Sequence, residues 1–409
     1  MFSSTQSIEE FCGINSYYNK FPFILPYHLH KSIPENFVVN EILNDKKVIN
    51  TANSLGDQEK GLFIHCVLKK ILIDTPGAIK LLAKELKIPS DWIGYAGLKD
   101  AQGTTFQRIS IFNPDQHMLD QLHFTNISVY NFIRKKYEVN LGDLWGNRFS
   151  ITMDRVTNEN AINFNIDELS TFLHKLNDTI YPNYFGLQRF GTSRPISHIV
   201  GKYLLKKDYE SAVKTYLITE SVLESNNITN LRRKLALDWD YKSFMDQIPR
   251  NYHYERSMAN SLSKYPNNYM KAFHSITSRI KKLFVSSYQS FIFNELLSMY
   301  ILKKETNNSL INEFPLVNSK ADFSLLPGYL QDHLESLLKK DQLTLDDFKK
   351  SDVSFKSKKN QFRKTFVKLD DFNFQLDSNF NKLVLNFSLP KSTYATMIIR
   401  EFTRNFNSH

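Results

Sequence analysis

The sequence predicts an α+β fold in which a mainly helical block is inserted into a strand-rich domain. About the first 155 residues consist mostly of short apolar runs typical of strands. From about Ser197 to Leu302 apolar residues recur at helical spacing, and strand patterns return after residue 365. A chain of 409 residues exceeds the size at which one core usually stops growing. We therefore expect two domains, with 1–196 and 366–409 forming the first and 197–365 the insertion.

The strands of the first part are expected at residues 37–42, 61–68, 92–96, 105–112, 127–139 and 147–153. A helix is expected after Asp74, because this N-capping residue precedes Pro76 in the first turn. The apolar residues of this helix recur on one face, as in a helix that packs on a sheet. They are Ile79, Leu82, Ala83 and Leu86.

The second half of the chain predicts helices first and strands later. One expected helix of the insertion carries Tyr288, Phe291, Ile292 and Leu296 on one face. The polar, lysine-rich segment from Lys349 to Lys364 is typical of a mobile loop on the insertion. Strands follow at 366–369 and 382–387, and a last helix carries Tyr394, Met397 and Ile398 on one side.

The composition, with 42% hydrophobic and 23% charged residues, indicates a soluble globular protein. Lys and Arg outnumber Asp and Glu by 52 to 42, and the net charge of +10 favours RNA, DNA or an anionic membrane as partner. Cys12 and Cys66 are too few for a disulfide framework or a cysteine metal cluster. Because there is neither a secretory pattern nor a run of 18 apolar residues, we expect a cytoplasmic protein, or a nuclear one in a eukaryote, without a membrane span.

The usual signatures of cofactor and metal sites are missing from the sequence. Gly56 and Gly61 have the outer spacing of a phosphate loop, but apolar residues stand where Lys and Ser or Thr are required. His28 and His30 have no acidic or cysteine neighbour at ligand spacing, so they are expected to be surface residues. An enzyme with this sequence is expected to work without metal or cofactor.

Asp100 directly follows a short apolar strand and precedes a run of small and hydroxyl-bearing residues. A loop at the end of a strand can present a reactive carboxylate on a rigid scaffold. The same pattern also suits a turn former or a helix cap. If residues 97–100 are extended, Lys99 points to the face opposite Asp100, and Lys31 or an arginine from elsewhere is the better partner for the carboxylate.

A second segment, Asn183 to Gly191, interleaves an amide, aromatic residues and an arginine. In an extended backbone Asn183 and Phe185 point to one side and Tyr184 to the other. A ring beside an amide suits a splayed-out base, and Arg189 can contact phosphate. The alternative interpretation is a well-packed aromatic turn.

Two further segments offer aromatic rings. Thr393 or Ser392 is expected to cap the last helix, with Tyr394 in its first turn facing a cleft, or else buried in the core. Lys31 and Phe37 flank the start of the first strand, where they provide a cation and a ring, or simply a solvated lysine before a core phenylalanine.

These segments in this order resemble the TruD family of tRNA pseudouridine synthases, in its archaeal and eukaryotic-like branch. The matching residues are Lys31 to Phe37, Gly97 to Asp100 with Thr104 and Gln107, Gly142 to Phe149, Asn183 to Gly191, Tyr288 to Asn294, Leu389-Pro390, Tyr394 to Thr396 and Arg400-Glu401. They extend over nearly the whole chain, and the nine-residue match at Asn183 to Gly191 is the most specific.

The resemblance implies a pseudouridine-synthase catalytic core, a mixed or antiparallel sheet with flanking helices, that carries an inserted, mostly helical TRUD domain. It implies isomerisation of uridine to pseudouridine at position 13 in the D-arm of tRNA, on a flipped-out base and without cofactor or metal. The implied partner is tRNA, with other RNAs possible substrates. The sequence determines no oligomeric state, and a monomer is our expectation.

The resemblance also assigns roles to residues. Asp100 would be the catalytic carboxylate, acting either as a nucleophile or as a base at the ribose. Asn183 and Phe185 would hold the flipped uracil, and Phe37 and Tyr394 would form other walls of the site. Lys31 would keep Asp100 ionised.

The sequence departs from the family pattern at a few positions. Gly103 replaces a frequent alanine and is expected to be harmless, whereas Ser392-Thr393 replace Gly-Ser and are expected to shift the backbone near Tyr394. Asn36 replaces an aspartate, which removes one negative charge near Phe37.

Two other functions compete with the synthase. One is a non-catalytic RNA-binding protein on the same scaffold. The other is a glycosidase that uses Asp100, which requires a second carboxylate beside it. The synthase hypothesis predicts that the side chains of residues 100, 183, 185 and 394 converge on one hollow.

Overall fold

The computed structural model describes residues 7–21, 24–30, 32–52, 55–156, 166–303, 310–350 and 361–404. The chain divides into two compact units. The core unit comprises Asn19–Tyr181 and Val367–His409, and the helical unit comprises Met1–Tyr18 and Pro182–Phe366. The helical unit is thus largely an insertion in the chain of the core unit, and the inserted, mostly helical domain of the α+β prediction is confirmed.

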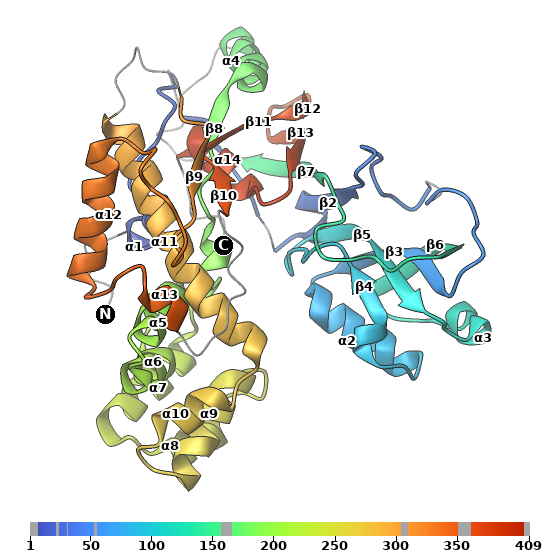
Figure 1. Cartoon of the computed structure of the whole chain (residues 1–409). Helices are drawn as coiled ribbons and strands as arrows, with labels where there is room; N and C mark the ends of the chain where they lie inside the picture. The colour runs from blue at the N-terminus through green and yellow to red at the C-terminus, as the bar shows by residue number, and fades with distance from the viewer. Residues whose placement is uncertain are drawn as a thin grey trace. The chain divides into compact units, whose positions relative to one another are not determined.

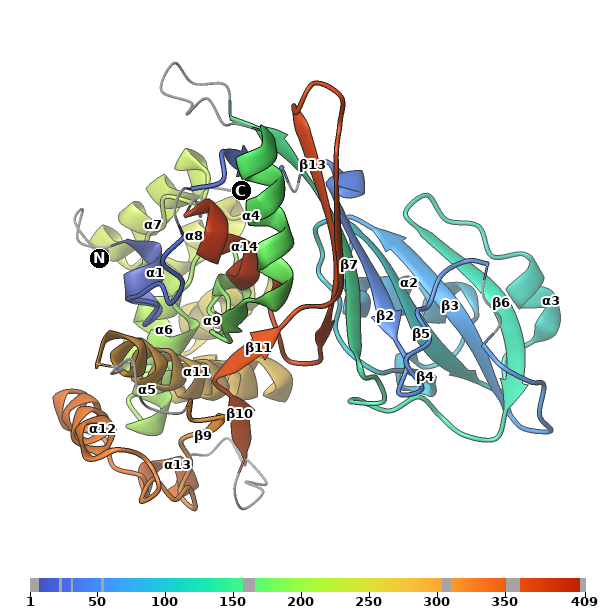
Figure 2. The ribbon, with the colours of Figure 1, turned by 90° about the horizontal axis from the view of Figure 1, so that it is seen from above.

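A mixed sheet forms the centre of the core unit (Figure 2). Among the described residues, nine strands make up this sheet, in the order β12-β13-β7-β2-β5-β3-β6, with β1 paired to β7 and β4 to β5. β2 and β5 run parallel, and the other neighbours run antiparallel. The strands are β1 (Tyr27–His28), β2 (Phe37–Ile42), β3 (Phe63–Ile71), β4 (Ile93–Tyr95), β5 (Thr104–Phe112), β6 (Ile127–Lys135), β7 (Gly146–Arg155), β12 (Asp370–Leu376) and β13 (Lys382–Pro390).

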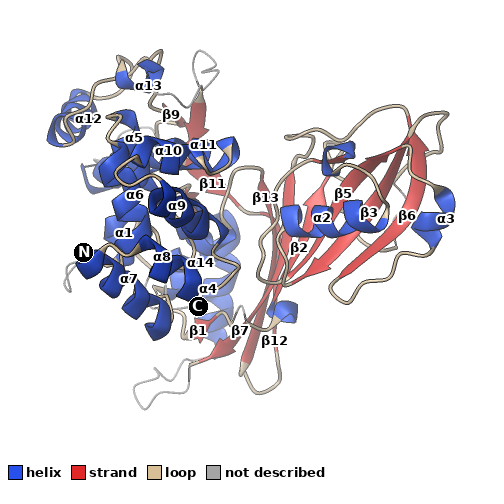
Figure 3. Ribbon diagram, turned by 90° about the horizontal axis from the view of Figure 1, so that it is seen from below, coloured by secondary structure: helices blue, strands red, loops and turns tan. Residues whose placement is uncertain are grey.

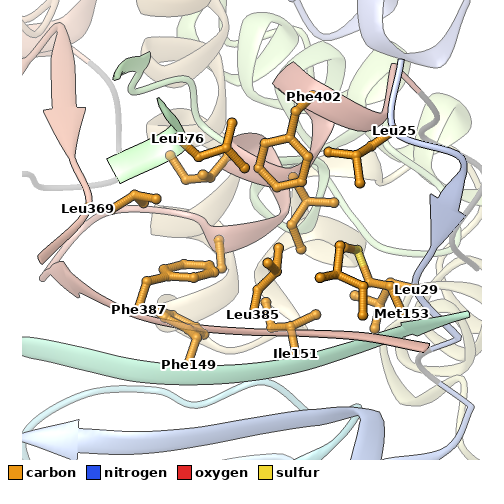
Figure 4. Close-up of a cluster of buried hydrophobic side chains, with 14 of the residues drawn as sticks. Leu25, Leu29, Phe149, Ile151, Met153, Leu176, Leu369, Leu385, Phe387 and Phe402 are labelled. Atoms are coloured by element: carbon orange, nitrogen blue, oxygen red, sulfur yellow. The ribbon is translucent and has the colours of Figure 1, made fainter. Parts of the chain in front are cut away.

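Helices cover two parts of this sheet. α2 (Thr75–Glu85) packs its apolar side on β3, β4 and β5 (Figure 3), and α3 (Gln116–Asp120) joins the same cluster. α4 (Ile166–Asp178) and α14 (Ala395–Thr403) pack on β7 and β13. Figure 4 shows Leu176 of α4 and Phe402 of α14 above Phe149 and Phe387 of the strands. Two short 3-10 turns, η1 (Pro34–Asn36) and η2 (Ser90–Trp92), precede β2 and β4.

The start of α2 is the one predicted from the sequence. The side chain of Asp74 caps the helix by accepting a hydrogen bond of 2.7 Å from the amide of Gly77. Pro76 lies in the first turn, where its missing N–H is no loss.

The helical unit is organised around α11 (Ser278–Lys303), the long helix of Figure 1, which packs against α5 and α12. Its other helices are α1 (Ile8–Phe11), α5 (Ser197–Leu205), α6 (Tyr209–Ile218), α7 (Asn226–Asp238), α8 (Tyr241–Gln247), α9 (His253–Lys264), α10 (Tyr269–His274), α12 (Gly328–Lys340), α13 (Asp347–Lys350) and the 3-10 turn η3 (Leu187–Arg189). β9 (Glu313–Pro315) pairs with β10 (Phe362–Lys364). The chain passes between the two units within β8 (Ile180–Pro182) and β11 (Phe366–Lys368).

The units differ from the expected domain bounds at the amino terminus and near residue 182. Asn15 donates its amide to Ser298 Oγ of α11 over 2.9 Å, and Phe185 donates its amide to Asn294 Oδ1 over 2.8 Å. These hydrogen bonds attach both segments to the helical unit. The loop predicted over Lys349 to Lys364 is wrong at both ends, because 349–350 belong to the helix α13 and 362–364 form β10; residues 351–360 lie outside the described part of the chain.

Candidate active site

Asp100 lies in the loop between β4 and β5, and its side chain is partly exposed. β5 begins at Thr104, which stands opposite Ile71 at the end of β3 and opposite Val38 near the start of β2. The Asp100 loop therefore leads into the sheet at the point where β5 begins, between the start of β2 and the end of β3. The sequence predicted such a loop between two strands.

Buried side chains hold the residues that directly precede Asp100 in this loop. The hydroxyl of Thr75, the first residue of α2, accepts a hydrogen bond of 3.0 Å from the amide of Lys99. The same hydroxyl donates to Gln107 Oε1 of β5 over 3.0 Å, and Gln107 Nε2 donates to the carbonyl of Gly97 over 3.2 Å. Thr75 and Gln107 are fully buried. The loop is thus tied to a helix and to a strand, which restricts where the carboxylate of Asp100 can lie.

The ammonium of Lys99 contacts other residues than Asp100. Its ammonium forms an ion pair of 2.9 Å with Glu41 of β2 and donates to Asn147 Oδ1 of β7 over 2.7 Å. Both charged side chains are buried. This agrees with the expectation that Lys99 is engaged elsewhere. Lys31, the expected partner of Asp100, lies outside the described residues.

Lys70 is a residue near Asp100 that sequence reasoning missed. Its ammonium, in a fully buried side chain of β3, donates to the carbonyl of Asp100 over 2.5 Å and to the carbonyl of Ile73 over 2.8 Å. Burial lowers the pKa of Lys70 to about 8; the charges of Asp100 and Asp74 act in the opposite direction, and Lys99 lowers it further. Strand alternation was the available signal, because Lys70 shares its parity with the buried Cys66 and Leu68.

Phe37 adjoins the Asp100 loop through its backbone, while its side chain is in the core. It is 2% exposed, and its ring centroid lies 6.1 Å from that of Phe149. A Cβ on Gly103 would lie 2.3 Å from the carbonyl oxygen of Phe37, and Gly103 has a φ of +107°. Glycine fits this backbone at the position where the family often has alanine, whereas an alanine here would clash and be strained.

Tyr394 is the N-cap residue of α14 and is half-buried. The helix begins at Ala395, Tyr394 is its N-cap residue and no side chain caps it by a hydrogen bond, so the expected capping by Ser392 or Thr393 is wrong. Ser392 has a φ of +67°, a conformation that glycine adopts readily, at the position where the resemblance implies glycine. The chain keeps that turn after β13 with a serine, and Tyr394 enters α14 in extended conformation.

Asn183 and Phe185 belong to the helical unit, and both contact Arg363 of β10. Arg363 donates to Asn183 Oδ1 over 2.9 Å and to the Asn183 carbonyl over 3.0 Å, and its guanidinium lies 3.7 Å from the ring centroid of Phe185. The side-chain hydroxyl of Tyr184 contacts Ser16 and Ser298 instead, while its carbonyl also accepts from Arg363. The predicted common side of Asn183 and Phe185 is confirmed, whereas Arg363 was missed because 180 residues separate it from Asn183.

The matched segment Tyr288 to Asn294 lies in α11, and its residues contact Phe185 and Arg189. Asn294 Oδ1 accepts from the amide of Phe185, and its Nδ2 donates to the carbonyl of Phe185 over 3.1 Å. Phe293 packs edge-on against the Phe185 ring, and Ser290 Oγ accepts from Arg189 Nε over 3.1 Å. The α11 residues thus fix the backbone and the ring of Phe185.

The structure therefore presents two groups of candidate site residues. Asp100, Phe37 and Tyr394 lie in the core unit, where the Asp100 loop adjoins Phe37 and where α14 shares a hydrophobic cluster with Phe37. Asn183 and Phe185 lie in the helical unit. The convergence of the two groups on one hollow stays a prediction. Among the described residues, no group of three or more His, Cys, Asp or Glu side chains is placed to hold a metal ion, and no helix has the length and apolarity that crossing a membrane requires.

Comparison with known proteins assigns the fold to a class. The structure is similar to the crystal structure of the putative tRNA pseudouridine synthase D (TruD) from Methanosarcina mazei, at 26% identity and a TM-score of 0.70, over 97% of each chain. The fold is thus that of a pseudouridine synthase with an inserted domain. The family model "tRNA pseudouridine synthase D (TruD)" matches residues 28–321 and 314–402, and the chain belongs to this family.

Curated relatives agree with this assignment. The probable tRNA pseudouridine synthase D 1 of Methanocaldococcus jannaschii is 30% identical over 383 residues, which cover 91% of this chain and 94% of the relative. The probable tRNA pseudouridine synthase D of Methanococcus aeolicus is 28% identical over 386 residues, covering 91% and 94%.

Proposed function

We propose that this protein is a tRNA pseudouridine synthase that isomerises uridine at position 13, in the D-arm of tRNA, with Asp100 as the catalytic carboxylate. Membership of the TruD family supports the reaction class. The observation that carries the role of Asp100 is its loop, which Thr75, Gln107 and Lys70 hold where it leads into β5. A carboxylate held in this way is suited to act on one bond of a bound nucleotide.

The reaction leaves the atoms of the nucleotide unchanged in number. The bond between N1 of uracil and C1′ of ribose breaks, a bond between C5 and C1′ forms, and the proton lost from C5 is balanced by a proton gained at N1. The Asp100 carboxylate acts either as a nucleophile on the nucleoside or as a base at the ribose. Both roles require the ionised form of the side chain.

We assign recognition of the uracil to Asn183 and Phe185. An amide side chain has two N–H donors and two acceptor lone pairs, so the hydrogen bonds to the Lys364 carbonyl and from Arg363 leave capacity for the polar edge of a base. The guanidinium groups of Arg363 and Arg189 lie over the Phe185 ring, 3.7 and 5.7 Å from its centroid, and the flipped base would stack on this ring. Phe37 and Tyr394 remain our candidates for other walls, and Lys31 for a second cation near Asp100.

The charge of the chain supports tRNA as the partner, because an excess of ten positive charges attracts a polyanion. We expect the protein to bind as a monomer and to act where tRNA is processed, in the cytoplasm or in a eukaryotic nucleus. A glycosidase is less well supported, since Glu41 is paired with Lys99 and Asp74 caps α2. Each of these carboxylates thus already has a structural partner.

The test is single-turnover conversion of a tRNA transcript, with pseudouridine mapped at each uridine. Wild type and Asp91→Ala, which changes an exposed carboxylate on η2, are expected to convert uridine 13, whereas Asp100→Ala and Asp100→Asn are expected to lose conversion and keep binding. Conversion undiminished in Asp100→Ala would end the catalytic assignment. Equal binding by wild type and Asp100→Ala without conversion by either would establish the non-catalytic alternative.

A further inference from the structure

Lys70 occupies a place in β3 that ordinarily belongs to an apolar side chain. Ile64, Cys66 and Leu68 precede it on the same side of the strand and pack under α2. Lys69, the adjacent residue, lies on the other side, with its ammonium 5.8 Å from the ring centroid of Phe106. Lys70 therefore extends the buried row of β3 to the start of α2, beneath the Asp100 loop.

The charged groups that face Lys70 come from two segments packed against it. Asp100 and Lys99 belong to the loop, and Asp74 caps α2. A buried ammonium is unfavourable unless hydrogen bonds and opposite charges compensate it. The carbonyls of Asp100 and Ile73 supply the hydrogen bonds, and the Asp100 and Asp74 carboxylates supply the charge. A neutral donor would be enough to hydrogen-bond the two carbonyls. The positive charge of Lys70 therefore indicates that this residue also acts on the Asp100 carboxylate.

We propose that Lys70 is a positioning residue for the isomerisation: its ammonium fixes the main chain of Asp100 and keeps the Asp100 carboxylate ionised when bound RNA covers the site. This inference rests on the proposed function. RNA that closes over the loop removes water and brings phosphates near, and both effects disfavour an ionised carboxylate. A cation buried beneath the loop opposes them without taking up room on the substrate side.

The first experiment measures single-turnover rates between pH 4.5 and 8 for wild type and for Lys70→Met, Lys70→Gln and Lys70→Arg. The matched control is Lys69→Met, which removes a neighbouring charge on the other side of β3. The acid limb of the pH–rate profile is the range in which the rate falls as Asp100 becomes protonated. For Lys70→Met and Lys70→Gln this limb is expected to move to higher pH by about 1–3 units, with unchanged tRNA affinity. Lys70→Arg, which keeps the cation, is expected to restore a limb near that of wild type.

The outcomes separate the inference from the proposed function. If wild type converts no uridine, the proposed function fails. If wild type converts uridine and Lys70→Met has the same acid limb as Lys69→Met, the function stands and the inference is overturned. A uniform loss of rate in Lys70→Met with no displaced limb likewise overturns the ionisation role.

A second measurement leaves Lys70 in place and needs no activity. The protonation of Lys70 is followed by NMR, with labelled lysine side chains, in wild type and in Asp100→Asn. Because the Asp100 charge supports the protonated form of Lys70, the pKa of Lys70 is expected to fall by about one unit or more in Asp100→Asn. An unchanged pKa would show that the two groups are not coupled and would overturn the inference, even if the Lys70 variants do not fold.

Discussion

The guanidinium of Arg363 lies 3.7 Å from the ring centroid of Phe185 and also hydrogen-bonds the side chain and the carbonyl of Asn183. One buried arginine thus orients both residues to which we assign uracil recognition. A cation stacked on the ring also makes that face unavailable to a base.

Arg363→Met is expected to destabilise the protein by about 3 kcal/mol, because it removes a buried charged donor from three acceptors, including the carbonyl of Tyr184. We also expect weaker tRNA binding, since Asn183 and Phe185 lose their common support. Urea unfolding and tRNA titration measure the two effects. Lys364→Met, which changes the exposed neighbour, is the control and is expected to alter neither. An unchanged free energy of unfolding in Arg363→Met would contradict the claim that Arg363 supports Asn183 and Phe185.

Gly103→Ala is expected to destabilise the protein by about 2–4 kcal/mol and to reduce conversion at least tenfold, because the new Cβ would lie 2.3 Å from the Phe37 carbonyl oxygen. Gly142 is the matched comparison. It also has a positive φ, of +97°, but a Cβ there meets no heavy atom within 4 Å. Gly142→Ala therefore carries the backbone strain alone, about 1 kcal/mol, and is expected to remain active. Equal effects of the two changes would refute the steric argument.

The buried pair of Lys99 and Glu41 predicts a non-additive mutant cycle. Lys99→Met leaves Glu41 charged and unpaired in the core, at an expected loss of about 3–5 kcal/mol. Adding Glu41→Gln removes that charge and is expected to recover part of the loss. Chemical unfolding of the two single variants and the double variant measures the coupling.

The control for this cycle is Arg233→Met, which breaks an exposed pair with Glu220 and is expected to have a much smaller effect. Strict additivity of the Lys99 and Glu41 changes would show that the pair does not hold the loop to β2.

The stability of the protein is expected to depend on alkaline pH through Lys70. Its pKa is lowered from 10.5 in the unfolded chain to about 8 in the folded protein, so between these values the unfolded chain binds more protons. The free energy of unfolding of wild type relative to Lys70→Met is therefore expected to rise, by up to about 3 kcal/mol, as the pH increases from 8 to 10.5. Urea unfolding at pH 7.5, 9 and 10 follows this difference. A difference that is constant or falls with pH would rule out the lowered pKa.

Much of the core unit was predictable from residues near one another in the chain. The strand predicted at 61–68 and the cap at Asp74 follow from local residue patterns and hydrogen bonding, and the structure has both elements, with β3 at Phe63–Ile71. The cap of α14 was predicted wrongly, because the positive φ of Ser392 shifts the start of the helix and is not apparent from residue type. The environment of Gly103 was missed for a similar reason: its close neighbour, the Phe37 carbonyl, belongs to another strand.

By itself, the sequence determined that the protein is α+β, that a helical block interrupts a strand-rich domain, and that Asp100, Asn183 and Phe185 are candidates for the site. Those features depend on periodicity and on motif residues that lie side by side in the chain. The tertiary structure alone decided that Lys70 lies beneath Asp100, that Lys99 pairs with Glu41 and that Arg363 supports Asn183. These partners are tens to almost two hundred residues apart, and only the packing of distant strands and helices brings the contacting groups within a few ångströms of one another.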